Sequence, residues 1–112
     1  MTKSMYEAGL KGNGLKEMKR NLNREHLKVI SNTVMEMAKA AGRTRVSINQ
    51  LLRETYNLVN VELDTYEGWA ARGNNVRKGQ RAYLFWGEPI TTEAGYRYCP
   101  VNYLFTAEQV SY

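Results

Sequence analysis

The spacing of apolar residues in the first part of the chain predicts one long amphipathic helix. An apolar residue recurs every three or four positions from Leu27 onward, which places the set on one helical stripe. The stripe consists of Leu27, Ile30, Val34, Met37 or Ala38, and Ala41. Gly42 is a natural C-terminal stop, so residues 15–41 read as helical, with a main helix over about 24–41 that Asn21 or Asn23 could cap. Residues 15–20 are expected to form a separate turn or short helix, and the Gly-rich residues 1–14 a flexible tail.

Two shorter helices are predicted by their capping residues. Ser47 and Gln50 have the spacing of a capping box, in which each side chain satisfies a free backbone donor. A helix is therefore expected from there to about Tyr56. The segment 64–67, Asp-Thr-Tyr-Glu, opens a third helix in the same way, and Gly73 ends it.

The pattern changes to that of β-strands after Gly73. Residues 81–86, Arg-Ala-Tyr-Leu-Phe-Trp, read as one strand, and residues 96–105 as a second strand in which Pro100 implies an edge or a bulge. A hairpin connection joins them, and 106–109 could cap a last helical turn. Side chains alternate along a strand, so at most one of Phe85 and Trp86 belongs to the core. The expected fold is α+β and a single domain, with N-terminal helices packed on a small antiparallel sheet or hairpin and Trp69 helping to seal that contact.

Charge adds a preference for an anionic partner. The chain has 112 residues, a net charge of +5 and a hydrophobic fraction of 43%. Residues 1–53 carry a balance of +7, with 11 Lys/Arg against 4 Asp/Glu, whereas residues 54–112 carry −2, with 5 against 7. The first half is therefore the broad electrostatic attractor for a polyanion.

No constellation of residues points to catalysis. His26 is the one histidine and lies within the long predicted helix, and Cys99 is the one cysteine and reads as a small buried hydrophobe. No phosphate-binding loop, dinucleotide motif or CxxC is present. We therefore expect a non-enzymatic protein without cofactor or metal. A single cysteine fits the reducing cytoplasm, and no run is long and apolar enough to span a membrane, so a soluble cytoplasmic protein is expected.

A short basic turn beside several rings is the most informative feature. Residues 77–81, Arg-Lys-Gly-Gln-Arg, project three cations from one loop, and Gly79 allows a positive φ. Cations along a path beside open aromatic faces suit single strands, because phosphates meet the cations and bases stack on the rings. The predicted site residues are Arg72, Arg77, Lys78, Arg81, Tyr83, Trp86, Tyr96 and Tyr98.

Each of these features also has an ordinary structural explanation. The basic turn could be solvated, and Trp69 could be a core residue. The basic run of the first helix could be a solvated face or could extend a phosphate path. That run comprises Lys16, Lys19, Arg20, Arg24 and Lys28.

The stretch from residue 66 to 110 resembles the single-stranded-DNA-binding domain at the N-terminus of ArdC-type antirestriction proteins. That family has a helix ending in Trp and Gly, a Val-Arg-Lys-Gly turn, a strand ending in an aromatic pair and a closing segment with Gln. The matching positions are Trp69, Gly73, Val76, Arg77, Lys78, Gly79, Gln80, Arg81, Phe85, Trp86, Phe105 and Gln109. The family's Trp- and Asn-rich segment is not recognisable here, and its second domain with the HExxH zinc site is absent.

The resemblance implies that residues 15–112 form a DNA-binding module that coats or shields a single strand without making or breaking a bond. It further implies a protein of a mobile genetic element, such as a plasmid, phage or conjugative transposon, with a role in antirestriction or DNA protection. The partner would be single-stranded DNA, with RNA left open. The alternative is a small protein–protein interaction module, or an inhibitor of a host enzyme, that uses the Tyr-rich hairpin, because Tyr, Trp and Arg are also favoured at protein interfaces.

Overall fold

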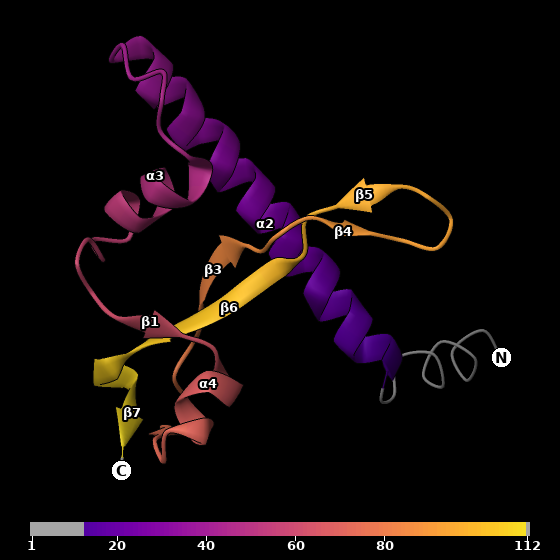
Figure 1. Cartoon of the computed structure of the whole chain (residues 1–112), viewed down its shortest axis with the longest axis vertical. Coiled ribbons are helices and arrows are strands. Elements are labelled where there is room, and N and C mark those ends of the chain that lie inside the picture. The colour runs from indigo at the N-terminus through magenta and orange to yellow at the C-terminus, as the bar shows by residue number, and fades with distance from the viewer. Residues whose placement is uncertain (1–12, 112) are drawn as a thin grey trace, which may run out of the picture.

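One long helix and a two-stranded β-ribbon cross over each other and define the shape of the protein (Figure 1). The computed structural model describes residues 13–111. The helices are α2 (Asn13–Ala40), α3 (Ile48–Thr55), α4 (Tyr66–Ala71) and the 3₁₀ turn η1 (Ala107–Gln109). The strands are β1 (Leu63–Asp64), β2 (Asn75–Val76), β3 (Tyr83–Trp86), β4 (Ile90–Thr91), β5 (Arg97–Tyr98), β6 (Val101–Thr106) and β7 (Val110–Ser111). The predicted α+β class is confirmed.

Helix α2 is longer at its start than the sequence pattern predicted. It runs unbroken for 28 residues from Asn13, so the separate turn expected at residues 15–20 is wrong, as is the tail where it included 13 and 14. The segment is rich in Leu, Lys, Glu, Met and Arg, which all favour helix without any apolar stripe. The rest of the predicted tail, residues 1–12, lies outside the described residues.

Near the C-terminal end of α2, the structure shows which of Met37 and Ala38 belongs to the buried stripe. Ala38 faces the core at 7% exposure, whereas Met37 is 66% exposed. Ala41 lies beyond the helix in the turn and is exposed, so its expected place on the buried stripe is wrong. Gly42 follows with a φ of +77°, the left-handed conformation with which many helices end.

Three of the strands form an antiparallel sheet with the order β1–β6–β3, and the pairs β2–β7 and β4–β5 form two separate two-stranded sheets. Strands β3 and β6 pair from Tyr83 opposite Leu104 to Trp86 opposite Val101. The second predicted strand is interrupted at Cys99 and Pro100, and beyond this break β4 and β5 continue as a hairpin with Ile90 opposite Tyr98. The ladder is thus interrupted beside Pro100, because proline has no N–H for it, and the extra residue lies on the facing segment 87–89. The short strands β1, β2 and β7 were not predicted.

Helix α3 covers the free edge of β3. The Asn49 side chain donates to the carbonyl of Trp86 at 2.8 Å and accepts from its N–H at 2.9 Å. The Tyr56 hydroxyl donates to the carbonyl of Leu84 at 2.9 Å. Ser47 caps α3 by accepting from the Gln50 N–H, but the Gln50 side chain contacts Glu54 instead, so only half of the predicted capping box forms. Side chains of α3 and of the residue after it thus provide hydrogen-bond partners for backbone groups at the edge of β3 that would otherwise have none.

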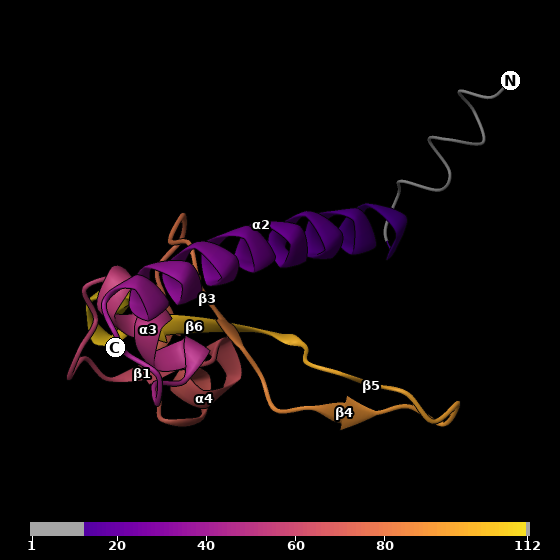
Figure 2. The same ribbon diagram turned by 90° about the horizontal axis from the view of Figure 1, so that it is seen from above.

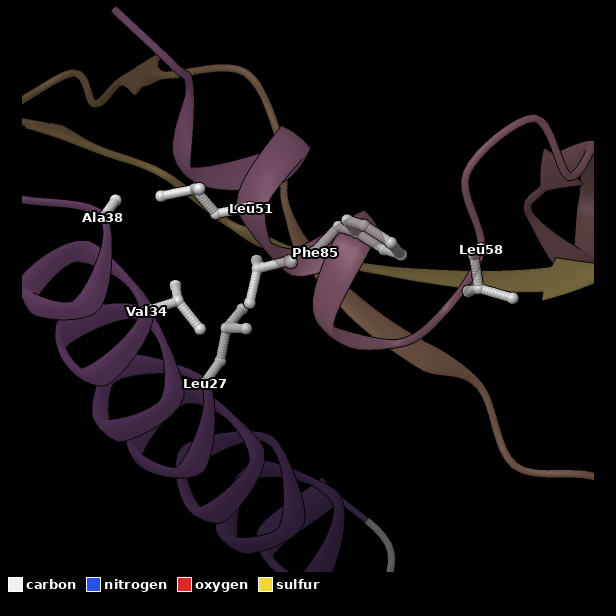
Figure 3. Close-up of a cluster of buried hydrophobic side chains, with 7 residues drawn as sticks. Leu27, Val34, Ala38, Leu51, Leu58 and Phe85 are labelled. Carbon is white, nitrogen blue, oxygen red and sulfur yellow. The ribbon is translucent and has the colours of Figure 1, made fainter. Parts of the chain in front are cut away.

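The main core lies between α2, α3 and β3 (Figure 3). Leu27 and Leu52 are fully buried, and Phe85 is 3% exposed. The other members of the cluster are Val34, Ala38, Leu51 and Leu58. Each large apolar side chain buried in this way contributes about 1.5–3 kcal/mol. Trp86 is only half-buried, so the alternation predicted for Phe85 and Trp86 is confirmed.

Trp69 belongs to a different contact from the one predicted. It is buried at 3% exposure, yet it lies on α4, and its indole N–H donates to the Phe105 carbonyl at 2.9 Å. It is not part of the cluster between α2 and β3, because α4 packs at the other end of β6. The expectation that Trp69 seals the α2 contact is therefore wrong, although its assignment to the core is confirmed.

Two arms project from this body and diverge (Figure 2). The first arm is the start of α2, in which residues 15–22 are all exposed and the first buried residue is Leu27. The second arm is the ribbon of β4 and β5, which extends the β3–β6 hairpin. The space between the arms is therefore bordered by side chains from both the N-terminal and the C-terminal half of the chain (Figure 2).

Candidate nucleic-acid interface

The helical arm carries a row of cations on the side that faces the body. Lys16, Arg20 and Arg24 follow one another at intervals of four residues, which gives a rise of about 6 Å between neighbours. At about 100° per residue they lie on the same side of α2 as the buried Leu27. Among residues 13–111, none of the three forms an ion pair with a carboxylate. The row is therefore a local concentration of uncompensated positive charge.

The ribbon arm presents its rings on one face. Ile90 lies opposite Tyr98, and the Thr92 N–H donates to the Tyr96 carbonyl. Because alternate residues share a face, Ile90, Tyr96 and Tyr98 all lie on the same side of the ribbon. Tyr96 is 64% exposed and Tyr98 is 40% exposed. Such exposure leaves ring surface open for a ligand.

Arg24 joins the two arms where they meet. Its guanidinium lies 5.3 Å from the Trp86 ring centroid and 5.8 Å from that of Tyr98. It also donates to the Cys99 carbonyl at 2.7 Å. The Trp86 indole in turn donates to the Ser31 hydroxyl of α2 at 2.8 Å. Since Tyr98 lies against Arg24, the aromatic face of the ribbon is turned toward the helix.

A groove follows the line where the cations and the rings face each other. One hollow of about 430 Å³ is lined by Arg20, Asn21, Arg24, Tyr98, Pro100, Val101 and Tyr103. A second of about 510 Å³ shares Arg24 with it and adds, among others, Lys28, Trp86 and Cys99. We call these two hollows together the inter-arm groove. One wall carries the cations that phosphates bind, and the other carries flat rings on which bases stack.

Another hollow, of about 640 Å³, lies on the opposite flank of α2. It is lined by Lys19, Asn23, His26, Ile30, Tyr56, Arg81, Ala82, Tyr83, Leu84 and Tyr103, and we call it the far-flank hollow. The Tyr56 and Tyr83 rings lie 5.5 Å apart in its wall. Burial raises the pKa of the Tyr56 hydroxyl, so that group stays protonated and keeps its hydrogen bond to Leu84.

The residues predicted as one site are divided by the structure among three places. Trp86 and Tyr98 line the inter-arm groove, and Tyr96 shares the ribbon face. Arg81 and Tyr83 line the far-flank hollow. The predicted continuous track of all eight residues is therefore not present.

The remaining three predicted cations lie outside both hollows. Arg72 forms ion pairs with Glu62 at 2.7 Å and Asp64 at 3.1 Å. These carboxylates raise the pKa of Arg72 and neutralise the charge that a phosphate would need. Its guanidinium also lies 4.2 Å from the Trp69 ring centroid, so its contacts are those of a structural residue.

The Arg77–Lys78 turn is held at the end of the molecule that carries β7. The Arg77 N–H donates to the Gln109 carbonyl at 2.8 Å, and its guanidinium donates to the Glu108 carbonyl. Lys78 is exposed, and Gly79 has the predicted positive φ, at +86°. Gln109 closes this region by donating to the Arg81 carbonyl. The turn is thus well formed, but it lies apart from the inter-arm groove.

The groove cations that were not assigned to the site from the sequence all come from α2. Arg20 and Arg24 were recognised only as a basic run that could extend a phosphate path. Their four-residue spacing on the side of Leu27 was the signal that they face the strands. Tyr103 gave no such signal, because nothing in the sequence fixes which face of β6 meets α2.

Comparison with known proteins identifies no relative. No family model, no curated protein and no solved structure matches this chain. Across the part of the chain that the structure describes, no helix combines the length and apolar character needed to cross a membrane. Within the same residues, no three His, Cys, Asp or Glu side chains gather as metal ligands would.

Proposed function

We propose that this protein is a non-catalytic module that binds single-stranded nucleic acid in the inter-arm groove. The observation that carries the proposal is that Arg20 and Arg24 of the cation row line one groove together with Tyr98 of the ribbon, and Lys16 continues the row one turn earlier on α2. Lys16, Arg20 and Arg24 contact successive phosphates, and Tyr96 and Tyr98 stack with bases. The two rings are two residues apart along a strand, about 6.6 Å, which is close to the spacing of the cations.

The usual strengths of base stacking and of phosphate contacts are sufficient for binding by this arrangement. Stacking of a base on an exposed ring is worth about 1–3 kcal/mol. Each phosphate contact adds salt-dependent affinity, with a slope of about 0.7 for a single strand. The protein needs no cofactor for this task, since occlusion of the strand requires only contact.

The resemblance of residues 66–110 to ArdC-type modules supports DNA as the strand, with RNA as the second choice. It also supports a role in antirestriction or DNA protection for a mobile genetic element, in the cytoplasm where such DNA is met.

The decisive test compares pairs of alanine substitutions at exposed cations. Lys16→Ala with Arg20→Ala should lower the salt slope of oligothymidine binding by about 0.7 for each phosphate that the variant no longer neutralises. Arg77→Ala with Lys78→Ala tests the site expected from the sequence, and Lys39→Ala with Arg45→Ala is the matched control that removes the same charge elsewhere. If the first pair behaves like the control while the second pair lowers the slope, the site is the turn and not the groove.

A second substitution separates stacking from charge. Tyr98→Ala should weaken binding by roughly tenfold, within the range expected when one base loses its stacking partner, with an unchanged salt slope. The absence of any binding to single strands at about 50 mM salt, in folded protein, would reject the nucleic-acid proposal.

The exposed ribbon supports one alternative, a protein-interaction module. Ile90 is 45% exposed and lies beside Tyr96 and Tyr98 on the same face, a combination typical of interface hot spots. A partner held by these residues would bind with little dependence on salt, in contrast to a polyanion.

A further inference from the structure

We infer that the far-flank hollow is a second nucleic-acid site, and that the protein holds a fork of two separated strands with α2 between them. This inference rests on the proposed function, because it assigns a second strand to the same kind of chemistry. It concerns the flank of α2 that the inter-arm groove does not use.

The two sites lie on opposite flanks of one helix. Lys19, Asn23, His26 and Ile30 line the far-flank hollow, whereas Arg20, Asn21, Arg24 and Lys28 line the inter-arm groove. At about 100° per residue, the mean directions of these two sets differ by roughly 145° around the helix axis. A ligand in one site therefore lies on the other side of α2 from a ligand in the other site.

The helix closes the space between the two sites against the sheet. Tyr103 lines both hollows, and its hydroxyl accepts from the Asn23 side chain at 3.4 Å. One turn further along, Leu27 is fully buried against the sheet. A single strand cannot pass directly from one hollow to the other at this point, so two strands are accommodated more simply than one.

The far-flank hollow has its own cations and rings. Lys19 and Arg81 are exposed, and among residues 13–111 neither forms an ion pair with a carboxylate. Tyr83 and Tyr103 contribute ring surface to the wall. The volume of about 640 Å³ is within the range of about 300–1,000 Å³ that small-molecule sites occupy. The hollow therefore repeats the chemistry of the groove with different cations, while Tyr103 lines both.

Two separate sites on one rigid body predict a preference for a branched ligand. When one arm of a fork is bound, the second arm is held close to the second site, and its binding becomes intramolecular. The wild-type protein should therefore bind a fork at least about tenfold more tightly than a duplex with one unpaired arm. Its salt slope should also be steeper, by about 0.7 for each added phosphate contact.

The experiment measures the affinity of the full chain for three oligonucleotide probes. They are a fork with two unpaired arms of about 10 nucleotides, the same stem with one such arm, and a single strand of about 20 nucleotides, lengths chosen from typical single-strand site sizes. Lys19→Ala with Arg81→Ala should lower fork affinity to that of the one-armed probe while changing single-strand affinity by less than about twofold. Both side chains are exposed, so the fold is expected to tolerate the change, and the unfolding midpoint verifies it. Lys39→Ala with Arg45→Ala is the charge-matched control.

Each outcome is decisive. Equal affinity of the wild-type protein for the fork and the one-armed probe would overturn the inference. So would a Lys19/Arg81 variant that loses single-strand and fork binding alike, because one strand would then follow a path around the start of α2. Failure of the protein to bind any single strand would instead reject the proposed function.

Discussion

Arg24 and Asn49 are the two residues whose contacts tie Trp86 into the structure from different sides. Arg24 lies over its ring and Asn49 holds its backbone. Both are half-buried polar side chains that join parts of the chain far apart in the sequence. Their roles depend on the tertiary fold, and neither was recognised from the local sequence, in which Asn49 is only the second residue of a helix.

Asn49→Ala should destabilise the protein by about 1–3 kcal/mol, because the Trp86 N–H and carbonyl at the sheet edge lose their partners together. Urea unfolding measures the difference. Asn32→Ala, an exposed position on α2, is the control and should change stability by less than about 0.5 kcal/mol. Equal stability of the two variants would mean that water satisfies the edge as well as Asn49 does.

The Arg43–Glu54 pair predicts a specific pH dependence. Hydrogen bonds from Arg43 and then Gln50 lower the pKa of Glu54 from 4.5 to about 2. A carboxylate whose folded pKa is depressed stabilises the protein above its unfolded pKa and loses that contribution as pH falls toward the folded value. Glu54→Gln should therefore be less stable than wild type at neutral pH. The difference should shrink between pH 4.5 and about 2. A difference that is constant across this range of acid unfolding measurements would contradict the assignment.

At the scale of elements, α2 has two halves with different sources of stability. Residues from Leu27 onward pack on α3 and β3, whereas residues 15–22 are exposed and depend on intrinsic helix propensity. The apolar period predicted the packed half because burial enforces that period. It could not predict the exposed half, in which the helix continues without any buried stripe.

Two leucines of α2 test this division directly. Leu27→Ala removes a fully buried side chain and should cost about 2–5 kcal/mol. Leu22→Ala removes one that is 65% exposed and should change the stability by less than about 0.5 kcal/mol. Both substitutions are of the same type in the same helix, so urea unfolding compares them without a difference in propensity. A large loss at Leu22 would indicate that the arm is packed in solution.

The sequence predicted the elements better than their arrangement. The cap at Ser47, the positive φ of Gly79 and the alternation of Phe85 and Trp86 are local, and all are present. The third helix is capped by Thr65, one residue after Asp64, with which the predicted box began. The candidate site was predicted from neighbours along the chain, which placed Arg77 and Lys78 beside the rings. The crossing of α2 over the sheet instead brings Arg24 to Trp86 and Tyr98, a contact between residues more than 60 positions apart in sequence. Local patterns carry no information on such a crossing.

At the scale of the whole molecule, stability and proposed binding are located in different parts. The buried residues belong to α2 from Leu27, α3, α4, β3, β6 and the segments joined to them, and the described residues 88–98 include no buried side chain. The ribbon arm therefore contributes surface and little core. In the proposed function this surface forms one wall of the inter-arm groove.

Replacing residues 88–99 with Asn-Gly tests this separation. The Gly87 N–H already donates to the Pro100 carbonyl at 2.7 Å, and Pro100→Thr in the same variant supplies the N–H that proline lacks, so a two-residue turn at this point matches the favoured hairpin connection. The shortened protein should retain its helical circular dichroism and unfold cooperatively, with a modest loss of stability because Arg24 no longer contacts Tyr98 and Cys99. Its affinity for single strands should fall by at least about tenfold, since both stacking rings of the ribbon are removed. The salt slope should change little, because Lys16, Arg20 and Arg24 remain on α2 and each phosphate contact sets a slope of about 0.7.

A folded variant with undiminished affinity would place the strand outside the inter-arm groove, whereas an unfolded variant would show that the ribbon supports the core. If the shortened protein does not fold, Tyr98→Ala in the intact chain still tests whether this ring stacks with a base.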